Sequence, residues 1–137
     1  AHTVGAALAL KGSGRIVVGV IGDGDFCMGM NALWTASAQD LPMMLVVANN
    51  QSYYNDEVHQ ERVAIQRHRS VENKGIGQRL DSPAIDLGSI AKAQGFEADT
   101  PVTTAEAFQQ ALAKGTDFVK SGGRYFIDAR IKGGYAS

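Results

Sequence analysis

The amino-acid sequence predicts a doubly wound α/β domain, in which helices cover both faces of a mostly parallel sheet. Two nearly unbroken apolar runs, at 16–21 and 43–48, are typical of parallel strands that are buried on both faces. Segments with helical patterning separate and follow these runs, and this alternation is expected of strand-helix-strand units. The chain has 137 residues, the size of one ordinary domain with a single core. We therefore expect 1–137 to form one domain.

Composition and charge exclude several classes of protein. With 45% hydrophobic and 20% charged residues, the chain has the composition of a globular α/β protein. A formal net charge of -1 gives no electrostatic argument for a nucleic acid or an anionic membrane as partner. No apolar run approaches the roughly 20 residues that span a bilayer. Cys27 is the only cysteine, which excludes an internal disulfide and is consistent with a reducing compartment. We expect a cytoplasmic protein.

The first half of the chain predicts helix, strand, helix and strand in that order. Residues 1–10 are expected to form a helix with Val4 and Leu8 on one face, followed by a glycine-containing turn. After the first strand, a second helix is expected at about 31–39. Its packing residues are Leu33, Trp34, Ala36 and Ala38. The chain begins without a polar run, a capping segment or a methionine, so we expect it to be the carboxyl-terminal portion of a longer protein.

The last third predicts two helices and a closing strand. Asp86 can cap a helix that runs to Gln94, and Gly95 can take the left-handed conformation that ends it. Thr103 and Glu106 have the spacing of a capping box for the next helix. The inner face of that helix is expected to contain Phe108, Leu112, Gly115 and Val119. The stretch 125–131 supplies the final strand. Large residues assigned to the core are Met44, Phe96, Phe108 and Phe118.

Polar residues follow the two apolar strands at the point where each strand ends. The first run stops at Gly22, Asp23 and Gly24, and the second stops at Asn49 and Asn50. The carboxyl ends of adjacent parallel strands meet at one edge of a sheet, and open α/β sheets bind cofactors at this edge. A helix that begins after a glycine turn also directs unpaired N–H groups outward, where they favour a phosphate. Alone, Gly-Asp-Gly is equally well explained as a tight turn with a helix cap, but the paired asparagines favour a functional site.

The paired motif resembles the cofactor motif of thiamine diphosphate-dependent enzymes. Its halves are Gly-Asp-Gly at 22–24 and Asn-Asn at 49–50, separated by 24 residues. The segment Ala-Leu-Trp-Thr-Ala at 32–36 is similar to the branch that contains acetolactate synthase and benzoylformate decarboxylase. The closing helix-strand-helix-strand pattern at 86–131 also matches, so the resemblance covers nearly the whole chain. It implies a C-terminal domain that binds the diphosphate of thiamine diphosphate through Mg²⁺.

The resemblance implies a magnesium site at the two strand ends. It places the Asp23 carboxylate, the Asn50 side-chain oxygen and the Ser52 main-chain carbonyl on the ion, and two diphosphate oxygens and a water complete six ligands. Asp25 and Phe26 are implied to give backbone N–H groups to the phosphates. Many relatives have serine in place of Asp25, and a second carboxylate near a diphosphate is unfavourable unless it points away or pairs with a cation. The implied cofactor-binding residues are Gly22, Asp23, Gly24, Asp25, Phe26, Asn50, Ser52, Tyr53 and Tyr54.

Several residues after the motif have two interpretations. Tyr53 and Tyr54 flank the diphosphate or the substrate, or they pack the loop onto the domain. His59 titrates near neutral pH, but its polar neighbours, Glu57 among them, favour an exposed helix face over acid-base chemistry. The stretch 62–82 is basic and lacks periodicity, which predicts a long loop. The resemblance implies that this loop borders the active site and subunit interface. Its arginines are more readily explained as solvated than as ligands of a phosphate or coenzyme-A tail.

The resemblance implies that the full enzyme is a 2-oxo acid decarboxylase or carboligase, a lyase or transferase. The glutamate that activates the cofactor lies on a pyrimidine-binding domain in this family, normally from a facing subunit. No residue of this chain matches it, so we expect no catalytic residue here and no turnover by the chain alone. The implied partners are that domain, a 2-oxo acid and further copies in a homo-oligomer.

Two other functions compete with this prediction. The first is a non-catalytic binding or regulatory module derived from such an enzyme, which keeps the fold without the chemistry. The second is nucleotide binding of the Rossmann kind. It is the weaker alternative, because no Gly-x-Gly-x-x-Gly motif follows the first strand and no ribose-binding acid follows the second.

Overall fold

The computed structural model describes residues 1–134 and contains a four-stranded parallel sheet. Its strands are β1 (Val18–Gly22), β2 (Met43–Asn49), β3 (Glu97–Ala98) and β4 (Arg124–Arg130), in the spatial order β1-β2-β4-β3. β2 pairs with β1 on one side and with β4 on the other, both in parallel register. The prediction that the two apolar runs form neighbouring parallel strands is therefore confirmed.

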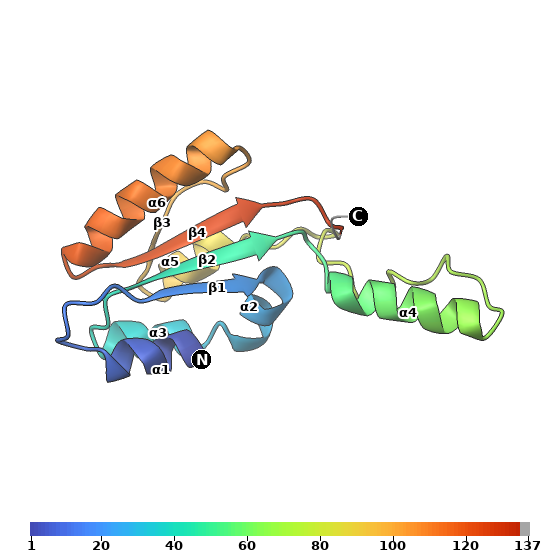
Figure 1. Ribbon diagram of the computed structural model, residues 1–137, viewed down its shortest axis with the longest axis horizontal. Helices are drawn as coiled ribbons and strands as arrows, with labels where there is room; N and C mark the ends of the chain where they lie inside the picture. Colours follow the sequence, from blue (N-terminus) through green and yellow to red (C-terminus); the bar gives the residue numbers. More distant parts are fainter. Residues whose placement is uncertain (135–137) are drawn as a thin grey trace.

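Helices lie on both faces of the sheet, as the doubly wound arrangement requires (Figure 1). One face is covered by α1 (His2–Ala9), α2 (Asp23–Gly29), α3 (Ala32–Ala38) and α5 (Leu87–Ala93). The opposite face carries α6 (Ala105–Lys120). The helix α4 (Tyr54–Gln66) extends away from the sheet (Figure 1). Within residues 1–134, no helix combines the length and the apolar character needed to cross a membrane.

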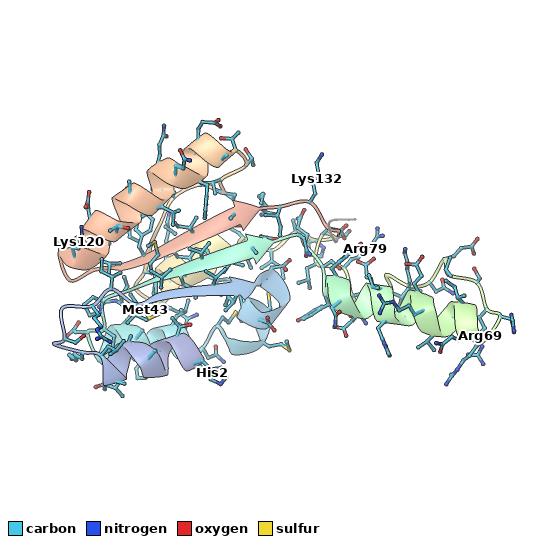
Figure 2. The ribbon with its side chains drawn as sticks, viewed as in Figure 1. His2, Met43, Arg69, Arg79, Lys120 and Lys132 are labelled. Carbon is cyan, nitrogen blue, oxygen red and sulfur yellow. The ribbon has the colours of Figure 1, made fainter. Side chains whose placement is uncertain are left out.

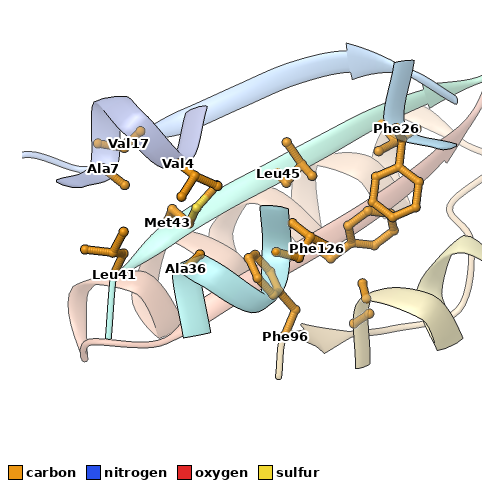
Figure 3. Packing of buried hydrophobic residues seen from close by; sticks show 14 of the residues in the cluster. Val4, Ala7, Val17, Phe26, Ala36, Leu41, Met43, Leu45, Phe96 and Phe126 are labelled. Carbon is orange, nitrogen blue, oxygen red and sulfur yellow. The ribbon is translucent and has the colours of Figure 1, made fainter. Parts of the chain in front are cut away.

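The larger cluster of buried side chains lies between the sheet and the helices α1, α2, α3 and α5 (Figure 3). Met43 and Leu45 of β2 are at its centre. Phe26 of α2 and Phe126 of β4 join helix to sheet, with ring centroids 5.1 Å apart. Such burial of apolar surface is the dominant favourable term in folding. This core therefore holds α2, and with it Asp23, at the carboxyl end of β1.

A second cluster lies between α6 and the opposite face of the sheet. Its buried residues are Met44, Val46, Ala111, Val119, Tyr125 and Ile127. Phe108 and Leu112 are partly buried against it, and Gly115 is buried. The predicted inner face of this helix is therefore confirmed.

The prediction that the first strand is covered on both faces is wrong for the described residues. Val18 and Val20 are 47% and 70% exposed. Both are paired in register with β2 residues that face α6. That helix packs mainly over β4 and β2, so these two side chains of β1 stay exposed. Some residues predicted to pack are also exposed, because α1, α3 and α6 turn other residues toward the core. These are Leu8, Trp34, Ala38 and Phe118.

The helix caps agree with the sequence in one case and differ in another. Asp86 Oδ1 accepts a hydrogen bond from the backbone N–H of Ser89 at 2.9 Å, so the predicted cap of α5 is confirmed. Thr104 caps α6, because its Oγ1 accepts from the backbone N–H of Ala107 at 3.1 Å. The predicted capping box that starts at Thr103 is therefore wrong by one residue.

Two helical segments were not expected from the sequence pattern. Residues 23–29 form α2, although the pattern predicts a helix after the first strand only at about 31–39. α4 continues to Gln66, so the predicted loop at 62–82 begins with a helical turn. Figure 2 shows Arg79 at the end of this extension near the sheet and Arg69 at its far end.

Candidate functional site

The two strand ends bring the predicted site residues together. Gly22, the last residue of β1, pairs in register with Ala48 of β2. Asp23 opens α2 directly after Gly22 and is only 3% exposed. Asn50 follows the last residue of β2. The parallel register therefore places the acid and the amide at one edge of the sheet, as their positions in the sequence predict.

The backbone N–H of Ser52 joins these two side chains. It donates to Asp23 Oδ2 at 3.1 Å and to Asn50 Oδ1 at 3.0 Å. Gln51 precedes it with a φ of 59°, a left-handed conformation that few non-glycine residues adopt. The structure thus gathers all three residues predicted as metal ligands around one nitrogen atom. Their binding of an ion stays a prediction.

A buried glutamate holds the side chain of Ser52. Ser52 Oγ donates to Glu57 Oε1 at 2.5 Å, and Arg79 Nε lies 3.5 Å from the same oxygen. Glu57 is 6% exposed, so the prediction that it lies on an exposed helix face is wrong. It is covered because the segment 78–80 returns to the loop 51–53 through backbone hydrogen bonds of 2.7 and 2.9 Å.

Tyr53 packs on the start of α2. A Cβ added at Gly24 would lie 2.5 Å from both Cδ1 and Cε1 of Tyr53, so only glycine leaves room for the ring. Tyr54 lies near Gly133, where an added Cβ would be 3.4 Å from Tyr54 Cδ2. Tyr53 therefore packs the loop onto the domain beside the predicted ligands. A contact between either tyrosine and a diphosphate stays a prediction.

Asp25 and Phe26 lie near the start of α2 in different surroundings. Asp25 is exposed, whereas Phe26 is 1% exposed with its ring in the core. Water around the Asp25 carboxylate reduces the repulsion expected between it and a diphosphate. The first turn of a helix leaves its leading N–H groups unpaired, at the positively polarised end. Both residues also line a cavity of about 420 Å³, a volume in the range of small-molecule sites.

Two buried polar residues at the same edge have no role predicted from the sequence. Asn49 Nδ2 donates to Asp128 Oδ1 at 2.9 Å, and each residue is 3% exposed. Arg130 Nη2 lies 3.3 Å from Asp128 Oδ2. Burial raises the pKa of Asp128, while the hydrogen bond from Asn49 and the charge of Arg130 act in the opposite direction. The sequence signal for Asp128 is an acid within an otherwise apolar strand, because such an acid requires a buried partner.

The polar residues His59, Arg67 and Arg69, on α4 and the loop after it, lie away from the strand ends. His59 is exposed on α4, and with Arg67 and Arg69 it lines a surface hollow of about 500 Å³. This placement agrees with the prediction of a polar, solvated surface. Arg79 approaches the site through its ion pair with Glu57.

Comparison with known proteins identifies relatives of this chain. The family described as thiamine pyrophosphate enzyme, C-terminal TPP binding domain, matches residues 1–129. Benzoylformate decarboxylase from Pseudomonas aeruginosa is 33% identical over 113 residues, which are 80% of this chain and 19% of that protein. The chain thus spans about a fifth of the length of that relative.

Solved structures of similar proteins give the same result. The thiamine diphosphate-dependent 4-hydroxybenzoylformate decarboxylase of Rhodococcus jostii RHA1 matches with a TM-score of 0.75 and 28% identity, over 98% of this chain and 23% of that one. Benzoylformate decarboxylase from Polynucleobacter necessarius has the same fold, with a TM-score of 0.76 at 24% identity, again over 98% and 23%. Because the family match extends over nearly the whole chain, this chain belongs to the thiamine pyrophosphate enzymes, as a C-terminal TPP-binding domain.

Proposed function

We propose that this chain binds thiamine diphosphate through Mg²⁺ as part of a 2-oxo acid decarboxylase or carboligase similar to benzoylformate decarboxylase. The observation that carries the proposal is the convergence of Asp23 Oδ2 and Asn50 Oδ1 on the N–H of Ser52, at 3.1 and 3.0 Å. This shared donor brings side chains from two separate strand ends into one neighbourhood, which supports a common ion site there. The names of two relatives, a benzoylformate decarboxylase and a 4-hydroxybenzoylformate decarboxylase, support an aromatic 2-oxo acid as substrate.

The donor set fits Mg²⁺. It consists of one carboxylate, one amide oxygen and the Ser52 carbonyl, and Mg²⁺ prefers such hard oxygen ligands in octahedral geometry. Within residues 1–134, no three His, Cys, Asp or Glu side chains are grouped as a metal site. Asp23 is the one anionic ligand in the proposed set, so the ion would keep positive charge for a diphosphate.

The residues of this chain bind and orient the cofactor. Asp23, Asn50 and Ser52 would hold the ion, and backbone N–H groups at the start of α2 would donate to the phosphates. When bound, thiamine diphosphate supplies the carbon nucleophile that adds to a 2-oxo acid and holds the electron pair left by CO₂. The activating glutamate is contributed by a pyrimidine-binding domain, from the same or a facing subunit of a homo-oligomer. The 137-residue chain alone therefore binds the cofactor weakly and has no decarboxylase activity.

Calorimetric titration of the chain with thiamine diphosphate, with and without Mg²⁺, tests the proposal. Wild type is expected to bind only with Mg²⁺. Asp23→Asn keeps the size of the side chain and an acceptor for Ser52 N–H but removes the charge, so it should weaken binding by roughly tenfold or more. Asp117→Ala is the matched control, since it removes an exposed acid from the helix α6. Circular dichroism checks that each variant is folded.

Two outcomes would reject parts of this proposal. If wild type shows no Mg²⁺-dependent binding at millimolar cofactor, the proposed ion site is rejected and the non-catalytic module is favoured. If the purified chain releases CO₂ from benzoylformate without a partner, the activating group lies within these residues and the assignment of the glutamate to another domain is wrong.

A further inference from the structure

Asp128 is a buried carboxylate that the proposed ligand set does not use. It lies on β4, in register with Val47 of β2, close to the carboxyl ends of both strands. One of its oxygens accepts from Asn49 Nδ2 at 2.9 Å, and the other lies 3.3 Å from Arg130 Nη2. A buried charge requires such partners. Both oxygens of Asp128 therefore have partners. One partner, Asn49, directly precedes the proposed metal ligand Asn50 in the chain.

The carboxylate fixes the orientation of the Asn49 amide. Asp128 accepts from the NH₂ group of Asn49 while Arg130 lies at its other oxygen, so the carbonyl oxygen of the Asn49 amide faces the opposite way. That oxygen accepts from the backbone N–H of Gln51 at 3.0 Å. A flipped amide would set NH₂ against this N–H, donor against donor. Asp128 thus determines which atom of Asn49 meets the loop.

The bond from Gln51 to Asn49 fixes the turn that presents Ser52. Gln51 has a φ of 59°, which is unfavourable for a residue with a Cβ unless its surroundings hold it. The N–H of Gln51 donates to Asn49 Oδ1, and the carbonyl of Gln51 accepts from the N–H of Leu80 at 2.7 Å. In this conformation the next N–H, from Ser52, reaches both Asp23 and Asn50. The carbonyl of Ser52 belongs to the following peptide, whose N–H, from Tyr53, donates to the Gln78 carbonyl at 2.9 Å.

We propose that Asp128 is a positioning residue for the diphosphate site, acting through Asn49 and Gln51 on Ser52. The inference rests on the proposed function, because it is Ser52 and its two acceptors that are assigned to the metal. The hydrogen bond and the ion pair of Asp128 go to Asn49 and Arg130, neither of which is a proposed ligand. It acts by selecting one orientation of one amide, and this orientation holds a left-handed residue between Asn50 and Ser52.

Two substitutions at Asp128 separate orientation from charge. Asp128→Val removes the acceptor but keeps a residue that favours strands. Asp128→Asn loses the charge but can still offer its side-chain oxygen to Asn49 Nδ2. Asp99→Ala is the control, because it removes another hydrogen-bonding carboxylate, the partner of Lys114. Each variant of the 137-residue chain is compared with wild type by circular dichroism.

The first readout needs no ligand. Amide hydrogen exchange of Gln51, followed by NMR, should accelerate roughly fivefold in Asp128→Val, the equivalent of one ordinary hydrogen bond. It should stay near the wild-type rate in Asp128→Asn and Asp99→Ala. The second readout is the affinity for Mg²⁺ with thiamine diphosphate, which should fall roughly tenfold in Asp128→Val. If Asp128 contributed only to overall stability, Asp128→Asn would not return the exchange rate of the Gln51 amide alone to the wild-type value.

The outcomes separate this inference from the proposed function. If wild type does not bind the cofactor, the proposed function fails, and exchange at Gln51 alone decides whether Asp128 positions the turn. If folded Asp128→Val shows wild-type exchange and affinity, the inference is wrong. If Asp128→Val does not fold, Asn49→Asp combined with Asp128→Asn decides, because this pair exchanges donor and acceptor. Restored protection of Gln51 in that pair supports the inference, and its loss overturns it.

Discussion

Gly24 is the residue that lets the ring of Tyr53 lie against the first turn of α2. In Gly24→Ala the added Cβ would stand 2.5 Å from two ring carbons, so the ring and the loop behind it must shift. We expect a loss of roughly 1–3 kcal/mol in the free energy of unfolding, as for other overpacked sites. Urea denaturation followed by circular dichroism measures it.

Gly22→Ala is the matched control for this change. Gly22 has a φ of -75°, and a Cβ there would meet its nearest atom at 3.7 Å, an ordinary contact. Its effect should stay within about 0.5 kcal/mol. Equal stability of the two variants would show that Tyr53 moves freely. The packing of Tyr53 on α2 would then have to be abandoned.

Single residues also show where sequence reasoning about the site ends. Asp23 and Asn50 could be placed together because each follows the end of a strand, and strand ends meet in a parallel sheet. Only the family resemblance adds Ser52 to them. Asp128 and Glu57 could not be placed there, because their burial depends on groups from distant segments. Asn49 donates a hydrogen bond to Asp128, and Arg79 forms an ion pair with Glu57. Helical spacing alone describes Glu57 as a solvated residue.

Gly115 lies where α6 packs closely against the sheet. An added Cβ would lie 2.6 Å from Tyr125 Cδ1 and 2.9 Å from Met44 Sδ. Gly115→Ala should therefore destabilise the chain by roughly 1–3 kcal/mol, although alanine is the better helix former. The expected readout is a lower midpoint of urea denaturation.

Gly5→Ala in α1 provides the comparison at the same substitution. A Cβ at Gly5 meets nothing within 4 Å, so only the helix propensity changes. We expect a gain of roughly 0.5–1 kcal/mol. If both variants are stabilised, α6 can move outward at low cost, and the close packing at Gly115 contributes little to the fold.

The elements could be predicted where a local signal is sufficient. The cap of α5 depends on Asp86 and a backbone N–H three residues later, which the sequence shows directly. The start of α6 is ambiguous, because Thr103 and Thr104 are adjacent and either can cap a helix. The helix α2 has two glycines in seven residues and a low propensity. Its existence depends on Phe26 packing against Phe126, a contact that no local pattern contains.

At the scale of the whole molecule, the two faces of the sheet are unequally covered. Four helices lie on one face and α6 lies alone on the other, within the described residues 1–134. The apolar run at 16–21 predicts a strand buried on both faces, because continuous apolar sequence is typical of strands that are covered on both sides. The apolar pattern of one strand does not indicate which helices the rest of the chain provides to cover its two faces. Val18 and Val20 are therefore apolar residues, of the kind expected in a core, at exposed positions.

Val20 and Val46 allow this difference to be measured. They are partners in register on β1 and β2, yet Val20 is 70% exposed and Val46 is 4% exposed. Val46→Ala should cost roughly 2 kcal/mol, from the lost transfer free energy of two methyl groups and the cavity they leave. Val20→Ala should change the free energy of unfolding by less than about 0.5 kcal/mol, since water already covers most of the side chain. Urea denaturation at low protein concentration gives both values. A loss at Val20 as large as that at Val46 would mean that the outer face of β1 is covered in solution. The unequal layering of the sheet would then be wrong.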